Sequence, residues 1–257
     1  MTTRKDSFLD RLVQKRALAR WARAARLADR LSLLALRPLR DDAQRLRREV
    51  DRVLHVADAR LTQPIIGKDA IPRPTGTDWA WRPELWRGPV SPAGVAAAQN
   101  RTMLGHEVSL FHDCKVNEVT LRQIRNRRAT DLAPFGLRLD VFRFDGSFLS
   151  VVVDLPPDAV QGLRQSHVIR LDCRAETERP LEMFARLNVQ HGPNTEQVVR
   201  QLPLNHEDIR VEFDLAYSRI HEKRVEKAWV DLIFEGPQMN QVVLRDLTFS
   251  RRLRAEI

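Results

Sequence analysis

The spacing of hydrophobic and polar positions predicts a long amphipathic helix over residues 8–36. This segment lacks glycine and proline, is rich in alanine, leucine and arginine, and follows Ser7, a residue type that caps helix N-termini. At about 100° per residue, one half of the helical wheel collects the apolar positions Val13, Ala17, Leu18, Trp21, Ala24, Ala25, Leu27, Ala28 and Leu31. The other half collects Arg11, Lys15, Arg16, Arg23, Arg26 and Arg30, and Arg20 intrudes on the apolar side. The pattern is that of a basic amphipathic helix.

A second helix is expected after Pro38, which predicts a break in the first. Asp41 and Asp42 favour a new helix start because carboxylates stabilise helix N-termini. Apolar residues then recur at spacings of four and three, at Leu39, Ala43, Leu46, Val50, Val53 and Ala57. Two helices joined by a short turn indicate an antiparallel αα-hairpin, or alternatively a coiled coil with another chain. The pattern leaves both open.

Residues 62–104 have a different composition. Six of the fourteen prolines lie between Thr62 and Asn100 and disfavour long helices and central strands. The same stretch contains TDWAWRPELWRG, with three tryptophans whose apolar area favours docking against another surface. We expect a Pro/Trp-rich strap that lies against the domain that follows.

From residue 105 onwards the hydrophobic period approaches two, which predicts strands. The candidates are 107–111, 137–144, 148–155, 168–174, 181–189, 197–202, 209–216, 229–234 and 241–249. Asp145-Gly146 predicts a hairpin turn between two of them. Short strands without crossover helices predict an antiparallel, jelly-roll-like β-sandwich over residues 105–257, so the chain is mainly β with an N-terminal helical arm over residues 1–61.

The net charge of +9 lies almost entirely in the arm. Residues 1–60 contain 16 lysines or arginines and 8 acidic residues, so the remainder is close to neutral. A basic amphipathic helix can lie on an anionic membrane or polymer, or it can be a solvated face whose apolar side packs on the second helix or on another copy of the chain. Specific nucleic-acid recognition is not expected, because no DNA- or RNA-reading motif is present. No apolar run reaches the length of a membrane span, and the arginines argue against a signal peptide.

The tryptophan segment is the candidate ligand site. Trp79, Trp81 and Trp86, interleaved with Arg82 and followed by Arg87, could offer flat apolar faces and hydrogen-bond donors to sugar rings or bases. The same residues could equally fasten the strap to the sandwich.

The candidate catalytic and metal-ligating residues form no recognisable motif. His112, Cys114, His167 and Cys173 have no zinc-like spacing, and two cysteines are too few for a disulfide framework. The sequence contains no Gly-rich phosphate loop, nucleophile elbow or HExxH segment. A carboxylate pair among Asp140, Asp145, Asp154, Asp172, Asp214 and Asp231 could in principle act as a glycosidase dyad. We expect no enzyme activity, no metal and no cofactor.

Three stretches carry a family resemblance: TDWAWRPELWRGP (77–89), LAPFGLRLDVFRFDGSFLS (132–150) and WVDLIFEGPQMNQVVLRDLTFSRR (229–252). They resemble an uncharacterised family found in Rhodobacter-type alphaproteobacteria, which implies a bacterial cytoplasm and no particular activity. The Trp-led strand, Gly-Pro turn and final strand of the third stretch are also similar to galactose-binding-like and carbohydrate-binding jelly rolls.

These observations predict a cytoplasmic binding or adaptor protein, which could lie at the inner face of the membrane. Its β-sandwich would bind a carbohydrate-type ligand or a protein partner, and its helical arm would dock to an anionic surface. The alternative is an assembly protein that oligomerises through the helical hairpin and has no small-molecule site.

Overall fold

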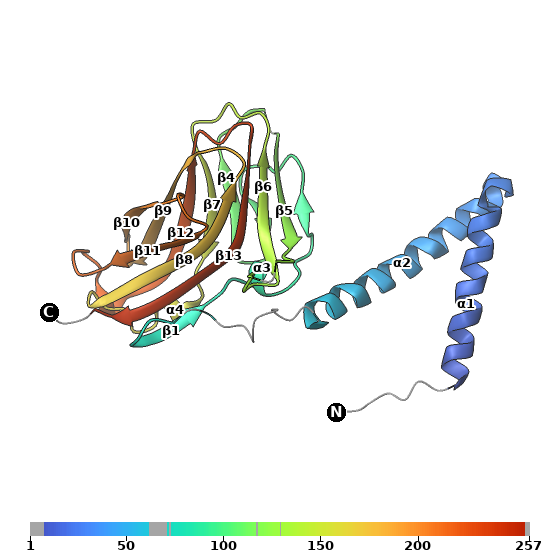
Figure 1. Cartoon of the computed structure of the whole chain (residues 1–257), viewed down its shortest axis with the longest axis horizontal. Helices are drawn as coiled ribbons and strands as arrows, with labels where there is room; N and C mark the ends of the chain where they lie inside the picture. Colours follow the sequence, from blue (N-terminus) through green and yellow to red (C-terminus); the bar gives the residue numbers. More distant parts are fainter. Residues whose placement is uncertain (1–7, 62–70, 72, 117, 129, 255–257) are drawn as a thin grey trace. The chain divides into compact units, whose positions relative to one another are not determined.

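The structure is a computed structural model that describes residues 8–61, 71, 73–116, 118–128 and 130–254 (Figure 1). The chain divides into two compact units, Met1–His55 and Val56–Ile257. The boundaries predicted at residues 61/62 and 104/105 remain predictions.

The helical arm lies in the first unit, except for the last turns of α2, which extend beyond His55. Helix α1 spans Phe8–Leu27, a single 3-10 turn η1 spans Ala28–Arg30, and α2 begins at Leu33 and runs to Leu61. Figure 1 shows α1 and α2 diverging from this turn. None of the helices in the described part of the chain is long and apolar enough to cross a membrane.

The predicted break at Pro38 is wrong. The chain turns at residues 28–32, and Pro38 lies inside α2. Ser32 starts this helix, because its carbonyl accepts hydrogen bonds from the backbone N–H of Ala35 and Leu36, both at 3.0 Å, and its Oγ lies 3.4 Å from the Ala35 nitrogen. Pro38 lies five residues after the helix start and removes one bond of the helical ladder, so the helix continues.

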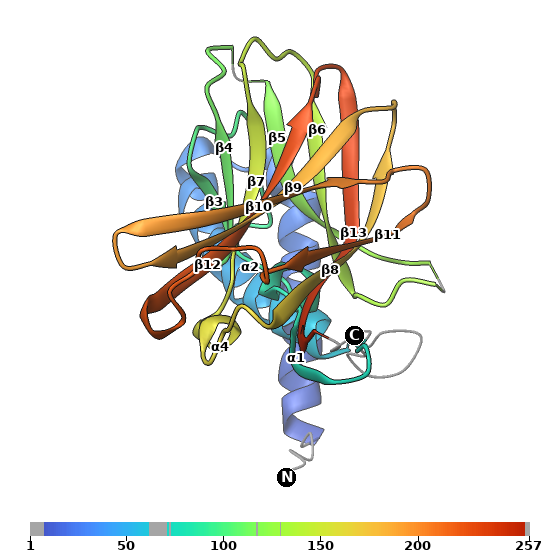
Figure 2. The ribbon, with the colours of Figure 1, turned by 90° about the vertical axis from the view of Figure 1, so that its left-hand side faces the viewer.

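The second unit is an antiparallel β-sandwich, which confirms the predicted fold class (Figures 1 and 2). The seven-stranded sheet has the order β11 (Asp208–Asp214), β8 (His167–Thr177), β13 (Asn240–Leu253), β6 (Phe135–Val141), β5 (Val119–Arg125) and β2 (Gly94–Val95), and β1 (Thr77–Trp81) also pairs with β13. The six-stranded sheet has the order β10 (Asn194–Leu202), β9 (Glu182–His191), β12 (Val225–Glu235), β7 (Leu149–Asp154), β4 (Val108–His112) and β3 (Thr102–Leu104). Three single turns complete the unit: α3 (Glu84–Arg87), α4 (Pro157–Val160) and η2 (Glu222–Arg224).

Each predicted strand overlaps an observed one, because alternate residues enter the core between the sheets. On β12, for example, Ala228, Val230 and Leu232 are almost completely buried, and the residues between them face outward. The sequence analysis missed β5, whose second half is charged, and the short strands β1, β2 and β3.

The hairpin predicted at Asp145-Gly146 is also wrong, because β6 belongs to the seven-stranded sheet and β7 to the six-stranded sheet. The connection between them packs closely against the loop after β4. A Cβ on Gly146 would lie 2.5 Å from Oδ1 of Asp113, so glycine is required here by a close approach and not by a two-residue turn.

The proline-rich segment is built into the sandwich. Strand β1 pairs with the C-terminal half of β13, and Leu85 and Trp86 of α3 are fully buried in the core. The indole N–H of Trp86 donates a hydrogen bond to the Leu244 carbonyl at 2.9 Å, which satisfies its polar atom inside the core.

Candidate functional site

The five residues of the tryptophan segment do not form one exposed platform. Trp79 and Trp81 stack with ring centroids 6.4 Å apart and pack against the core, and Trp86 is fully buried. Arg82 is 1% exposed, and its guanidinium donates to both carboxylate oxygens of Asp246 at 2.8 and 2.9 Å. Arg82 and Trp86 are therefore buried in the sandwich and bonded within it.

Arg87 is the exposed member of the set. Its guanidinium lies 3.9 Å from the Glu107 carboxylate, at the surface.

Most of the basic residues predicted to meet an anionic surface are exposed on the helical arm. Lys15, Arg16, Arg20, Arg23, Arg26 and Arg30 all have exposed side chains, and the side chain of Arg11 lies outside the described residues. Arg20, which interrupts the apolar face, lies 5.7 Å from the centre of the Trp21 ring. The role of these basic residues at an anionic surface remains a prediction.

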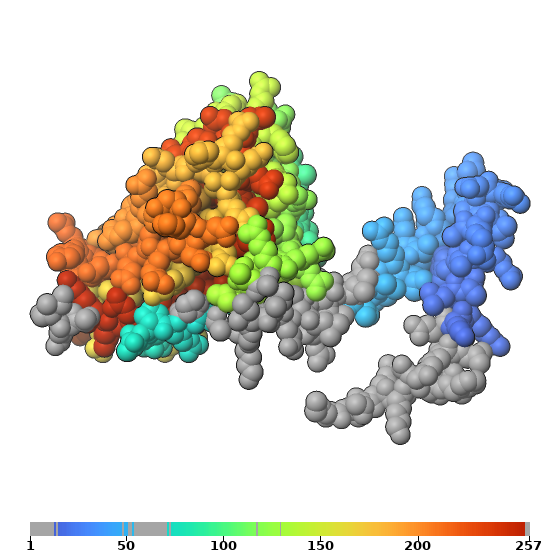
Figure 3. All heavy atoms as spheres, in the orientation of Figure 1, coloured from blue at the N-terminus to red at the C-terminus, as the bar shows by residue number. Residues whose placement is uncertain are grey.

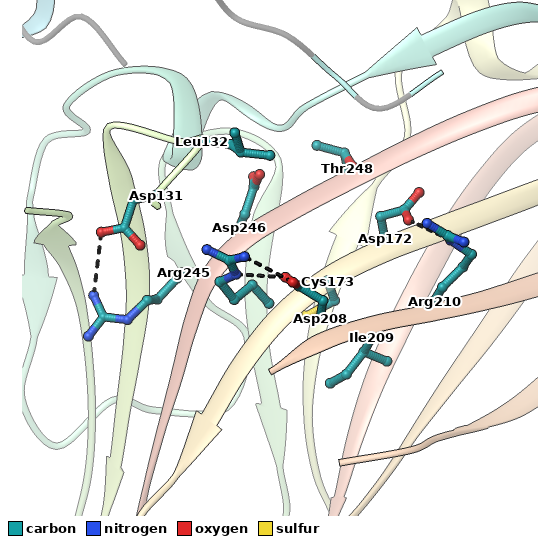
Figure 4. Close-up of a pocket in the computed structure, with 11 residues that line it drawn as sticks. Asp131, Leu132, Asp172, Cys173, Asp208, Ile209, Arg210, Arg245, Asp246 and Thr248 are labelled. Atoms are coloured by element: carbon teal, nitrogen blue, oxygen red, sulfur yellow. Dashed lines mark hydrogen bonds and ion pairs between the residues drawn. The ribbon is translucent and has the colours of Figure 1, made fainter. Parts of the chain in front are cut away.

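A polar pocket of about 250 Å³ lies at the seven-stranded sheet, between β8, β11, β13 and the loop before β6 (Figure 4). Figure 3 shows the surface formed by β8, β11 and β13, coloured yellow to red. Four carboxylates and three arginines line the pocket: Asp131, Asp172, Asp208, Asp246, Arg174, Arg210 and Arg245.

Carboxylates of this pocket are paired with arginines. Asp208 accepts hydrogen bonds from Nε and Nη2 of Arg174 at 2.7 and 3.0 Å, and the pKa of its carboxyl is lowered by this guanidinium. Asp172 is held by Arg210 at 3.1 Å and, more closely, by Arg170 at 2.6 Å. The pocket is thus lined by an ion-pair network, in which Asp172, Asp208 and Asp246 are each bonded to an arginine.

The thiol next to this network is not activated. Burial raises the pKa of Cys173, and the nearby carboxylates of Asp246 and Asp172 raise it further, so the group stays protonated at neutral pH. Within the described residues, no group of three His, Cys, Asp or Glu side chains could hold a metal ion.

A larger groove, of about 730 Å³, lies on the outer face of the six-stranded sheet. It runs across β4, β7, β12, β9 and β10, and its walls include Phe111, Phe148, Val152, Trp229 and Ile233. The outward face of a sheet is usually polar, so an apolar and aromatic row at this position is unusual.

Strand register places polar groups beside the Trp229 ring. Trp229 of β12 lies opposite Asp154 of β7 on one side and Asn188 of β9 on the other. Two residues further along β12, Asp231 lies opposite Arg186. Gln197 of β10 in turn lies opposite Asn188. Side chains from β7, β12, β9 and β10 therefore meet at the floor of the groove.

Hydrogen bonds fix these polar groups in place. Asp231, only 4% exposed, accepts from Nε of Arg186 at 2.7 Å and from Nδ2 of Asn188 at 3.1 Å. The Oδ1 of Asn188 in turn accepts from Nε2 of Gln197 at 3.0 Å. The rotamers of the floor are thereby determined before any ligand arrives, which lowers the entropic cost of binding.

Trp229 is partly exposed, and a second ion pair lies beside its ring. Nζ of Lys227 lies 5.5 Å from the ring centre and 2.8 Å from Oδ1 of Asp154. With Arg186 paired to Asp231, the groove has two positive and two negative side chains. Its net charge is zero, which favours an uncharged ligand with both apolar and hydroxyl surfaces.

This groove is not among the sites predicted from the sequence. There, Trp229 only begins a predicted strand, and Asp154 and Asp231 are only members of the set of carboxylates considered for a glycosidase dyad. An aromatic residue at an outward position of a period-two strand is the signal that could have found the site.

Fold and groove together define the class of protein: an antiparallel β-sandwich with an open, charge-balanced groove on one face, preceded by a basic helical arm. The chain belongs to a family of unknown function, DUF6478, whose model matches residues 1–257. No curated protein matches it.

Several solved structures are similar to the sandwich. A family 11 carbohydrate-binding module from Clostridium thermocellum, in complex with a β-1,3-1,4-mixed-linked tetrasaccharide, matches 61% of this chain and 96% of its own, with 10% identity and a TM-score of 0.37. The C-terminal family 22 carbohydrate-binding module of C. thermocellum Xyn10B matches 73% of this chain and 99% of its own, with 6% identity and a TM-score of 0.36. The enzymatically active domain of bacteriophage CBA120 tailspike protein 4 matches 55% of this chain but only 19% of its own, with 8% identity and a TM-score of 0.40. At these identities and TM-scores, the similarity says nothing about the ligand of this chain.

Proposed function

We propose that this protein is a non-enzymatic binding protein whose sandwich holds a neutral, carbohydrate-type ligand in the groove of the six-stranded sheet. The observation that carries the proposal is the partly exposed Trp229 ring in the groove, beside the fixed Arg186–Asp231–Asn188 cluster. A pyranose ring has an apolar face, which an aromatic ring can cover, and a belt of hydroxyl groups, each both a donor and an acceptor. The accessible polar groups of the groove, on Arg186, Asp154 and Gln197, can pair with such hydroxyls, whereas Asp231 and Asn188 are buried and hold their neighbours in place.

The balance of charge supports a neutral sugar over an anionic one. An anionic ligand would have to compete with Asp154 and Asp231 for the two cations of the groove. The protein groups already satisfy these charges, so a neutral ligand can bind without breaking an ion pair.

The experiment is affinity electrophoresis of the full chain in gels that contain mixed-linked β-glucan, xylan or galactan. Retardation in at least one gel is expected, and Trp229→Ala should weaken it about tenfold or more, because an aromatic contact and its buried area are lost. Trp21→Ala on the helical arm is the matched control and should migrate like the wild type. Unretarded wild-type protein in all three gels would contradict the neutral-sugar site, and the groove would then be tested against a protein partner.

The arm completes the proposed function by docking the protein to an anionic surface, such as the inner face of a bacterial membrane. Its exposed cations support this role, since each Lys or Arg near an anionic headgroup contributes about 1 kcal/mol. Binding to anionic vesicles should fall steeply with added salt, because exposed charges are screened over about 10 Å at 0.1 M ionic strength.

One observation favours the alternative, an assembly protein that oligomerises through the arm. Leu46, Val50 and Val53 of the predicted helical seam are 44%, 47% and 67% exposed on α2. Such a seam can pair with the same seam of a second copy. Mass measurement in solution, with Val50→Asp as the disrupting variant, distinguishes the two roles.

A further inference from the structure

The turn between the two helices of the arm exposes a cluster of leucines. Leu33 and Leu34 are 79% and 81% exposed, and Leu27 and Leu31 on the other side of the turn are 43% and 36% exposed. These residues lie where α1 ends and α2 begins, so they form one end of the helical unit (Figures 1 and 3). Single exposed leucines are normal, but a contiguous group at the end of an element is typical of a contact surface.

The apolar surface continues from the turn into the space between the helices. A groove of about 590 Å³ is lined there by Trp21, Ala24, Ala28, Leu36, Leu39 and Ala43, with other side chains. The apolar sides of α1 and α2 therefore face an open groove and do not close on each other. The leucines of the turn and this groove form one connected apolar region at the same end of the unit.

Arginines surround this apolar region. Between residues 16 and 40 the sequence has seven arginines and one acidic residue, Asp29. Arg23, Arg26, Arg30 and Arg37 are exposed on both sides of the turn. The ion pairs recorded for the described part of this unit, Arg40–Asp41 at 3.1 Å and Arg45–Asp42 at 2.6 Å, lie beyond the turn on α2.

We infer that residues 27–37, which comprise the turn and the helix ends beside it, insert into the interface of an anionic lipid bilayer, with their leucines below the headgroups and their arginines at the level of the phosphates. This inference rests on the proposed docking of the arm and specifies the element that enters the membrane. An interfacial element of this kind buries its apolar side about 5–10 Å deep, and guanidinium groups bind phosphates through paired hydrogen bonds.

Charge complementarity selects the bilayer over a second copy of the chain at this surface. Pairing two copies through the turn would bring the two arginine clusters together, and Asp29 alone cannot neutralise them. An anionic membrane provides the opposite charge and the apolar layer in one partner.

Co-sedimentation with vesicles tests the inference on the full chain. The probes are vesicles of 70% phosphatidylcholine with 30% phosphatidylglycerol, and vesicles of phosphatidylcholine alone. The test variant is Leu33→Ser with Leu34→Ser, and the matched control is Leu46→Ser with Val50→Ser, which removes two exposed apolar residues from α2 away from the turn. Circular dichroism checks that both variants keep the helix content of the wild type.

We expect the wild type to bind the anionic vesicles, the turn variant to bind them at least tenfold more weakly, and the control to bind like the wild type. Equal binding by the wild type and the turn variant would overturn insertion of the turn but leave electrostatic docking intact. Equal losses in the turn variant and the control would also overturn it, since the effect would not be specific to the turn. Absence of wild-type binding to anionic vesicles would refute the docking proposal and this inference together.

Discussion

The ion pair between Arg82 and Asp246 offers the sharpest test of how the proline-rich segment is held. Arg82 follows β1 and is 1% exposed, and Asp246 lies at an irregularity of β13, with its side chain 14% exposed. Arg82→Ala removes both hydrogen bonds to the Asp246 carboxylate, at 2.8 and 2.9 Å, and leaves that carboxylate without its counter-charge.

The expected cost follows from this geometry. Removing one partner of a buried ion pair costs about 3–5 kcal/mol. Asp246 keeps a hydrogen bond from the Leu247 backbone N–H at 2.8 Å and some solvent contact, and Nη1 of Arg82 is buried without a partner in the wild type. Both facts favour the lower end, about 3 kcal/mol, which for a unit of this size lowers Tm by roughly 6–12 °C.

Urea unfolding followed by tryptophan fluorescence measures this loss, since tryptophans of the sandwich report on its core. Arg87→Ala is the matched control, because its side chain is half-exposed and lies 3.9 Å from Glu107, and it should change stability by less than about 0.5 kcal/mol. A loss in Arg82→Ala no larger than that of the control would refute the reasoning. It would show that the cost of burying the guanidinium cancels the attraction within the pair.

Three further predictions concern the reactivity of Cys173, the loss of stability at acidic pH, and the independent folding of the β-sandwich. Cys173 should not react with iodoacetamide in the native state at pH 8, because burial raises the pKa of its thiol, and it should react once the protein is unfolded. Mass spectrometry that finds the label on Cys173, as distinct from the partly exposed Cys114, in the native protein would contradict this prediction. The hydrogen bonds from Cys114 and from the backbone N–H groups of Val116 and Lys115 lower the pKa of Asp145 to about 2. The contribution of Asp145 to stability is therefore present above about pH 4 and is lost between pH 4 and 2. Asp145→Asn should flatten the pH dependence of the unfolding free energy in this window, and an unchanged slope would count against this prediction. The fragment 61–257 should unfold cooperatively in calorimetry, as expected for a self-contained core, whereas a broad, non-cooperative transition would show that the arm is needed for folding.

The local pattern was sufficient for much of the fold because it reports burial residue by residue. Nine strands were located from the alternation of apolar positions, and the arm from its helical period and charge. The same information failed at Pro38, because a proline near a helix start costs only one hydrogen bond, and Ser32 nearby provides a better place to begin the helix.

Only the tertiary structure decided which candidate side chains are exposed and which strands pair. Trp86 and Arg82 look like ligand-binding residues in the sequence, but β1 and α3 pack into the sandwich and bury them. Asp145-Gly146 reads as a hairpin, but strand partners are chosen by the pairing of whole strands, which places β6 and β7 in different sheets.

The groove shows the same division. The sequence alone determined the strands that carry Trp229, Asp231 and Asn188, because their apolar neighbours alternate with a period of two. Only the tertiary structure decided that they lie together, because their strands are far apart in sequence and are neighbours solely through the order and register of the six-stranded sheet. The alternation along one strand determines which face of the sheet each side chain is on, whereas a binding site depends on which strands become neighbours.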